Sequence, residues 1–251
     1  MRIQIVSDLH LEAREKTTFE TFLEDKLTDT LALLGDICPM GHPNLRKFLE
    51  WCSERWKTVL YVPGKSECFS EPFTTVEASI ARLRSICAPY PNIHVLYRDA
   101  FYSEDGFLVL GCPFWSFSPK AEKFIRKLHR EDLDWIKKMT QEYNSKCLVL
   151  THFGPVEWVQ HEYGPEDPAA APIFTETELL LREPIVVWAF GHCHSYIEYS
   201  KTWSVAGGIP QAVLLVCNGM GPPRGPLSRP PLEDFRRDAV LRLVTSSTKV
   251  K

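Results

Sequence analysis

Short apolar runs alternate with longer amphipathic stretches along most of the chain. Continuous apolar runs bounded by turn residues predict buried strands, whereas apolar residues spaced three or four apart predict helices. The predicted strands are residues 3–6, 31–34, 59–62, 93–96, 148–150, 185–190, 196–199, 212–216 and 239–244. The predicted helices are residues 44–56, 75–86, 120–143 and 176–181.

The order of these elements indicates the fold class. Residues 100–103 and 107–110 predict a hairpin, because Glu104-Asp105-Gly106 between them supplies turn residues. Strands separated by helices, followed by hairpin-like strands, predict an α/β fold with a two-sheet β-sandwich flanked by helices. No linker of distinct length or composition divides the 251 residues, so we expect one domain over residues 1–251.

The composition is that of an ordinary soluble globular protein, with 44% hydrophobic and 24% charged residues. The formal net charge of −3 gives no electrostatic reason to expect broad nucleic-acid binding. A small phosphorylated substrate remains compatible with that charge, because a bound metal ion supplies local positive charge.

Cysteine usage and hydropathy bear on the compartment. The chain has 8 cysteines and none of them forms a CxxC pair, which favours buried free thiols in a reducing environment. No apolar run approaches the length of a membrane span, and the first residues lack a signal-peptide core. We therefore expect a cytoplasmic protein with no membrane association.

One pattern occurs five times: an apolar strand is followed by a short polar loop that carries metal-ligand residue types. The loops contain Asp8-Leu9-His10, Gly35-Asp36, Gly64-Lys65-Ser66-Glu67, Thr151-His152 and Gly191-His192-Cys193-His194. Carboxyl ends of strands are where open α/β folds build their sites. The sequence therefore predicts one site assembled from all five loops.

The spacing within the loops suits metal binding. Asp8 and His10 are two residues apart, so in an extended segment both side chains point to the same side. His192 and His194 have the same spacing, which turns Cys193 away from them and predicts that Cys193 packs in the core.

Four of the five loops, in the same order, resemble the motifs of the calcineurin-like metallophosphoesterase family. The matching segments are Asp8-Leu9-His10, Gly35-Asp36, Thr151-His152 and Gly191-His192-Cys193-His194. The resemblance covers nearly the whole chain and implies a four-layer α-β-β-α fold. Each motif alone is weak, but four in order, each after a predicted strand, are specific.

The resemblance also implies roles for individual residues. Asp8, His10, Asp36 and His194 would bind a first metal ion. Asp36 would bridge to a second ion, which His152 and His192 would also bind. Ligands of nitrogen and oxygen without a thiolate favour manganese, iron or zinc.

The third motif departs from the family. The family sequence is Gly-Asn-His-Glu, whereas this chain has Gly64-Lys65-Ser66-Glu67. Lys65 replaces an asparagine that binds the second metal, and an ammonium group has three donors and no acceptor. Ser66 replaces the histidine that assists the phosphoryl transition state or the leaving group.

Three arrangements of the second site remain open at this point. Lys65 supplies positive charge in place of an ion, or the ion binds weakly while Lys65 turns away, or the site is catalytically inactive. Our hypothesis is the first, with one tight metal site, a doubtful second site, and Lys65 and Ser66 as the catalytic candidates.

Three further residues are candidates for substrate binding. His161 follows the fourth motif, Asn218 precedes a Gly- and Pro-rich stretch over residues 218–231, and Trp115 lies in an aromatic run. For Trp115 the alternatives are packing in the core and a wall that stacks on a substrate ring.

The function expected from these features is metal-dependent hydrolysis of phosphomono- or diesters through a metal-bound hydroxide. The expected partner is a small phosphorylated substrate or a nucleotide. The alternative is a catalytically impaired module that keeps the fold and the metal for interaction or regulation.

Overall fold

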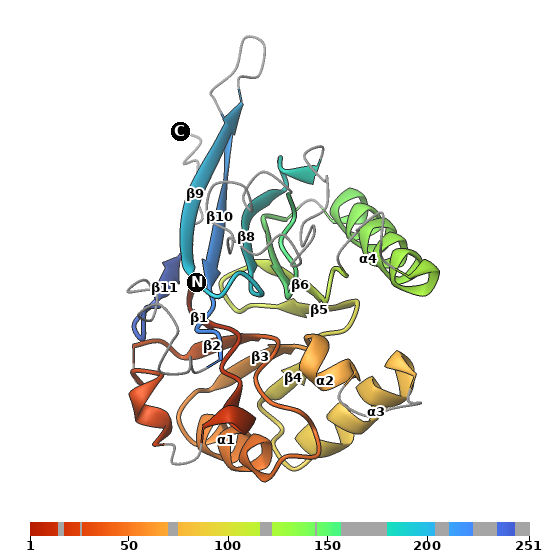
Figure 1. Cartoon of the computed structure of the whole chain (residues 1–251). Coiled ribbons are helices and arrows are strands. Elements are labelled where there is room, and N and C mark those ends of the chain that lie inside the picture. The colour runs from red at the N-terminus through yellow and green to blue at the C-terminus, as the bar shows by residue number, and fades with distance from the viewer. Residues whose placement is uncertain are drawn as a thin grey trace, which may run out of the picture.

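The computed structural model describes residues 1–14, 18–25, 27–69, 75–115, 122–143, 145–156, 180–203, 211–222 and 235–243 (Figure 1). The strands are β1 (Arg2–Val6), β2 (Thr30–Leu34), β3 (Thr58–Val62), β4 (Ile93–Val95), β5 (Asp99–Tyr102), β6 (Leu108–Cys112), β7 (Cys147–Thr151), β8 (Ile185–Phe190), β9 (Tyr196–Trp203), β10 (Gln211–Asn218) and β11 (Val240–Arg242). The helices are η1 (Leu11–Ala13), η2 (Phe19–Thr21), α1 (Pro43–Ser53), α2 (Lys65–Phe69), α3 (Val76–Cys87) and α4 (Lys123–Glu142).

The strands form two sheets. The first has the order β11-β1-β2-β3-β4, in which β1 to β4 are parallel and β11 pairs antiparallel with β1. The second has the order β5-β6-β7-β8-β10-β9, in which β5 and β9 are antiparallel edge strands. An isolated bridge between Ser7 and Gly219 links the first sheet to the second just beyond β1 and β10.

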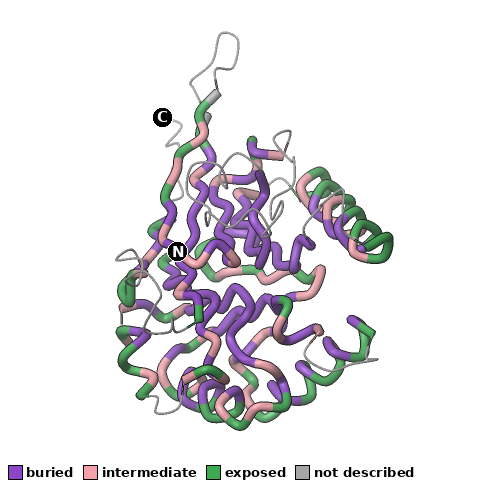
Figure 2. The backbone as a smooth tube through the Cα atoms, in the orientation of Figure 1, coloured by how far each residue is buried: buried purple, intermediate pink, exposed green. Residues whose placement is uncertain are grey.

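Successive side chains of each strand point to opposite faces of its sheet and so pack in different cores. In β2, Ala32 and Leu34 face a core between the two sheets, whereas Leu31 and Leu33 face the core under α1 and α3. The strands of the second sheet alternate in the same way between the central core and a core under α4. The inner strands β1, β2, β3, β6, β7 and β8 are thus buried along nearly their whole length, as the purple segments of Figure 2 show, which explains why they read as continuous apolar runs.

The helix starts follow local chemistry. His42 precedes Pro43, the first residue of α1, and its Nδ1 accepts a hydrogen bond from the Asn44 amide at 3.3 Å. Thr75 caps α3 by accepting from the Ala78 amide at 3.2 Å. The first amides of a helix have no partner within the helix. Proline has no amide hydrogen to leave unpaired, and the threonine side chain accepts a hydrogen bond from one of these amides.

The predicted two-sheet sandwich flanked by helices is confirmed. The hairpin is also confirmed, because β5 and β6 pair antiparallel and Gly106 turns between them with a φ of +79°. The sequence did not predict the short helices α2, η1 and η2. The predicted helix at 176–181 lies outside the described residues except for its last two. No helix among the described residues is long and apolar enough to cross a membrane.

Candidate metal centre

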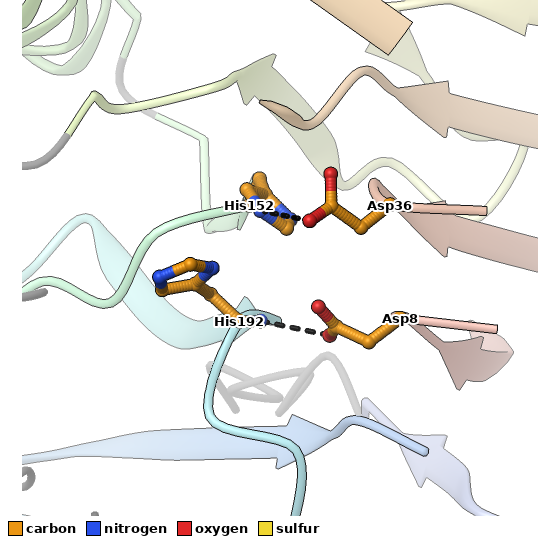
Figure 3. A group of neighbouring side chains, drawn as sticks. All are labelled: Asp8, Asp36, His152 and His192. Carbon is orange, nitrogen blue, oxygen red and sulfur yellow. Dashed lines mark hydrogen bonds and ion pairs between the residues drawn. The ribbon is translucent and has the colours of Figure 1, made fainter. Parts of the chain in front are cut away.

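The six predicted ligands lie at the carboxyl ends of four parallel strands. Asp8 and His10 follow β1 and Asp36 follows β2, both in the first sheet, whereas His152 follows β7 and the pair His192 and His194 follows β8 in the second sheet. Figure 3 shows four of them, with the carboxylates and the imidazoles approaching each other from different strands. The site therefore lies where the ends of the two sheets meet.

The backbone at the ligands adopts a conformation that non-glycine residues rarely take. Asp8, His10, Asp36, His192 and His194 all have positive φ, between 45° and 67°. Such residues cost free energy, and they persist where the surrounding structure imposes the conformation, most often at functional sites. Left-handed turns, rather than the extended segments expected from the spacing, direct these side chains into the site.

The ligand atoms form two groups that share one carboxylate. The first group is Asp8, Asp36, His152 and His192, and the second is Asp8, His10 and His194; within each group the ligand atoms lie within 4.8 Å of one another. Asp8 belongs to both groups. The bridging position that the resemblance assigned to Asp36 stays a prediction.

Several ligand atoms are buried and lack a hydrogen-bond partner among the described residues. They are Asp8 Oδ1, His10 Nε2, His152 Nε2 and His192 Nδ1. Burying a polar atom without a partner is unfavourable, so a group of such atoms at one point indicates a missing ligand. Carboxylate oxygens and imidazole nitrogens are the donor set of a divalent cation such as manganese, iron or zinc, and the residues present fit such an ion.

Neighbouring acceptors set the proton positions of two histidines. His152 Nδ1 lies 2.8 Å from the Leu34 carbonyl oxygen, and because a carbonyl only accepts, Nδ1 carries the proton. His10 Nδ1 lies 3.1 Å from the carboxylate oxygen Oε1 of Glu12, which also only accepts, so Nδ1 of His10 carries the proton as well. In the neutral form of both rings Nε2 is then the nitrogen that can bind a metal ion, and the partner fixes the orientation of the ring.

Opposite charges and burial shift the pKa values of the ligands. Burial alone would raise the pKa of Asp8, but the His194 imidazole, whose Nε2 lies 3.4 Å from Asp8 Oδ1, and the charges of nearby histidines outweigh burial and lower it. Burial, followed by the charge of His152, lowers the pKa of His192 to about 3. Asp8 is therefore ionised and His192 neutral near neutral pH, which are the forms that bind cations.

Glu67 supports the site from behind, and the sequence prediction did not include it among the site residues. Its buried carboxylate accepts hydrogen bonds from the amides of Asp36, Ile37, Cys38 and Gly64 and from the Tyr61 hydroxyl, at 2.7–3.3 Å. Burial and the charge of Asp36 raise the pKa of Glu67, whereas the bonds from Tyr61 and Gly64 lower it. The carboxylate fixes the loop that carries Asp36.

The altered third motif contacts the site through its backbone. The Ser66 amide donates to Asp36 Oδ1 at 2.6 Å, while the side chain of Ser66 is partly exposed. Lys65 is the first residue of α2 and is exposed. A β-carbon at Gly35 would lie 2.6 Å from His152 Nδ1, so only glycine fits between these loops.

The substrate candidates lie in different surroundings. Trp115 is buried in the core and contacts the rings of Phe69 and Phe153. Asn218 is buried, and its side-chain amide donates to the carbonyl oxygens of Ile5 and Arg236, so it joins β1 to a C-terminal segment. His161 lies outside the described residues. Cys193 is buried in the core, as predicted.

The chain was compared with known protein families, protein sequences and solved structures. No protein-family model matches the chain. The uncharacterised protein L509 of Acanthamoeba polyphaga mimivirus is 24% identical over 240 residues, which cover 77% of this chain and 85% of that protein. The protein TT1561 of Thermus thermophilus has a similar structure, with a TM-score of 0.52 and 16% identity over 87% of this chain and 88% of that chain.

A further solved structure has a TM-score of 0.54 and 16% identity, and the match covers 87% of this chain and 90% of that chain. At this level of identity the likeness establishes the fold of this chain, and the chemistry of the site rests on its own residues.

Proposed function

We propose that this chain is a metal-dependent phosphoesterase, a hydrolase of phosphomono- or diesters, whose second metal site is altered. The observation that carries the proposal is the group of buried, unpartnered carboxylate and imidazole atoms where the two sheets meet. Strain at the same residues supports it, because five ligand candidates share the rare left-handed conformation. The fold agrees with this assignment.

The residues divide into ligands and supporting groups. Asp8, Asp36, His152 and His192, together with His10 and His194, would bind one or two divalent ions. A bound ion supplies Lewis-acid chemistry, which neutralises charge on a phosphate and makes water a stronger nucleophile near neutral pH. Glu12 and the Leu34 carbonyl keep two imidazoles in the orientation and proton state that this requires.

Lys65 stands where the third motif of the resembled family has an asparagine, and its charge gives it a different role. Lys65 is exposed and immediately precedes Ser66, whose amide donates to Asp36. An ammonium group there attracts the phosphate of a substrate and disfavours a second cation beside it. The proposal is therefore one tightly bound ion, with Lys65 in place of part of the second site and a small phosphorylated compound as substrate.

The first experiment measures metal content and hydrolysis together. Purified protein should retain one ion per chain after dialysis and should hydrolyse aryl phosphomono- or diesters when manganese, iron or zinc is supplied. Chelation should abolish turnover and re-addition of metal should restore it. Two ions per chain that are both lost slowly would contradict the single tight site. No turnover with any metal or pH would favour a non-catalytic module, which the loss of the motif histidine at Ser66 makes the second candidate.

Restoring the third motif should increase activity. The double substitution Lys65→Asn with Ser66→His should raise kcat on an aryl phosphodiester by about a hundredfold or more, because a positioned acid contributes roughly 10²–10⁴-fold. The same variant should bind a second ion. Lys65→Asn alone separates the metal effect from the acid effect, and an unchanged kcat in the double variant would show that the third motif does not limit the rate.

A further inference from the structure

The first half of α4 carries a stripe of positive charge. Lys123, Arg126, Lys127 and Arg130 follow the spacing i, i+3, i+4 and i+7, so they share one face of the helix. All four are exposed, and together with Phe124 they line a surface cavity of about 690 Å³. In a chain with a net charge of −3, such a concentration of cations on one face is a local feature.

Most of this charge is not neutralised by the described part of the chain. Lys127 Nζ lies 3.6 Å from Glu131 Oε1, and the other oxygen of Glu131 binds Arg98 at 2.9 Å. Within the described ranges, Lys123, Arg126 and Arg130 form no ion pair. An array of free cations at helical spacing attracts a ligand that carries several negative charges.

An exposed aromatic ring connects the stripe to the third motif. The Phe124 side chain is 46% exposed, and its ring centroid lies 6.2 Å from that of Phe69, the last residue of α2. Phe69 is one helical turn, about 6 Å along the axis, after Lys65. The contact between Phe69 and Phe124 therefore joins α2, which begins at Lys65, to the stripe on α4, and these residues form a path from the third motif to α4.

We infer that this path binds a single-stranded nucleic acid whose scissile phosphodiester reaches the metal centre, an inference that rests on the proposed function. The stripe alone extends about 10 Å along the axis of α4, from Lys123 to Arg130, so it can contact more than one phosphate. Cations that contact successive phosphates, with an aromatic ring on which a base stacks, are the elements of single-strand recognition. The patch is small, so binding is local and modest, in keeping with the acidic charge of the whole chain.

The test measures binding without cleavage. Fluorescence anisotropy with a fluorescein-labelled oligothymidylate of about eight nucleotides, added to the metal-free protein in chelator, should show saturable binding. Three or four phosphate contacts predict that the logarithm of the association constant falls with the logarithm of salt concentration with a slope of about −2 to −3. Arg126→Ala with Arg130→Ala should reduce the size of that slope by about 1.4 and weaken binding at low salt by about tenfold or more.

Two further variants separate charge from stacking. Phe124→Leu should weaken binding by about tenfold and leave the salt slope unchanged, because stacking is lost while the cations remain. Arg46→Ala with Lys47→Ala removes the same charge from exposed positions on a different helix, α1, and should bind the oligonucleotide like the parent. An equal loss in this control pair, or no saturable binding by the parent, would overturn the inference.

The specificity and the link to catalysis are tested separately. Polyglutamate that competes as well as an unlabelled oligonucleotide would show an acidic protein partner instead and would refute the nucleic-acid assignment. The Arg126→Ala, Arg130→Ala variant should hydrolyse a small aryl phosphodiester at the parental rate, and its KM for an oligonucleotide should rise. Binding without any hydrolysis would refute the proposed function alone, whereas hydrolysis of small esters without binding would refute this inference alone.

Discussion

Replacing Asp8 by asparagine should remove metal binding and lower kcat by on the order of a thousandfold, since a bound ion contributes several kcal/mol of transition-state stabilisation. Asp8 is completely buried and belongs to both ligand groups. Asparagine keeps the size of the side chain, and its oxygen can still accept the His192 amide hydrogen bond of 2.8 Å. The substitution therefore removes the negative charge and leaves the local packing in place.

The measurements for this variant are elemental metal content after dialysis and hydrolysis of an aryl phosphodiester. The matched control is Asp29→Asn, which makes the same chemical change at an exposed carboxylate just before β2, where Asp29 pairs with Lys57 at 2.6 Å. The control should keep its metal and its activity. Retention of the parental metal content by the Asp8 variant would show that Asp8 is not a ligand.

The sequence predicts the strands well because their burial is simple. In β1 to β3 and β7 both faces are covered, so the apolar runs themselves mark the elements. The short helix α2 is different, because five residues after a glycine are too few to show a helical period. Its formation depends on tertiary contacts such as the bond from the Ser66 amide to Asp36.

The identity of the ligand residues could be predicted, but their geometry could not. The spacing of Asp8 and His10 places both side chains on one side only if the backbone is extended, and in the structure both residues have positive φ. That conformation comes from contacts between loops, such as the hydrogen bond of 2.9 Å that the Asp8 amide donates to the Gly35 carbonyl oxygen. Which carboxylate approaches both groups also depends on how the two sheets meet, and a single chain sequence carries no local signal for it.

The two carboxylates that support the ligands, Glu12 and Glu67, differ in how far the sequence predicts their roles. Glu12 lies two residues after His10, so the sequence Asp-x-His-x-Glu offers a local signal for its role. Glu67 is 31 residues from Asp36 in sequence, and its role arises because β2 and β3 are neighbours in the sheet. The third motif thus retains its supporting carboxylate although Lys65 and Ser66 replace the residues that act in the site.

Replacing Glu67 by alanine should lower the free energy of unfolding by about 3–5 kcal/mol, the typical cost of removing one partner from a buried charged network. The change leaves the amides of Asp36, Ile37, Cys38 and Gly64 without their acceptor in a buried region. Each buried donor that loses its partner costs about 1–3 kcal/mol unless water replaces it. The loop that carries Asp36 should lose its fixed position, so metal affinity should fall as well.

Urea unfolding measures the first effect, and titration of the metal-free protein with manganese measures the second. The control Glu54→Ala removes a carboxylate that is 65% exposed and pairs only with Arg55 at the surface, among the described residues, and it should change stability by less than about 0.5 kcal/mol. Glu67→Gln should be intermediate, because its amide oxygen still accepts while its amino group faces other donors. If the alanine variant were as stable as the parent and bound manganese with the same affinity, the four amides would have found other acceptors, and the position of Asp36 would be set by the strands alone.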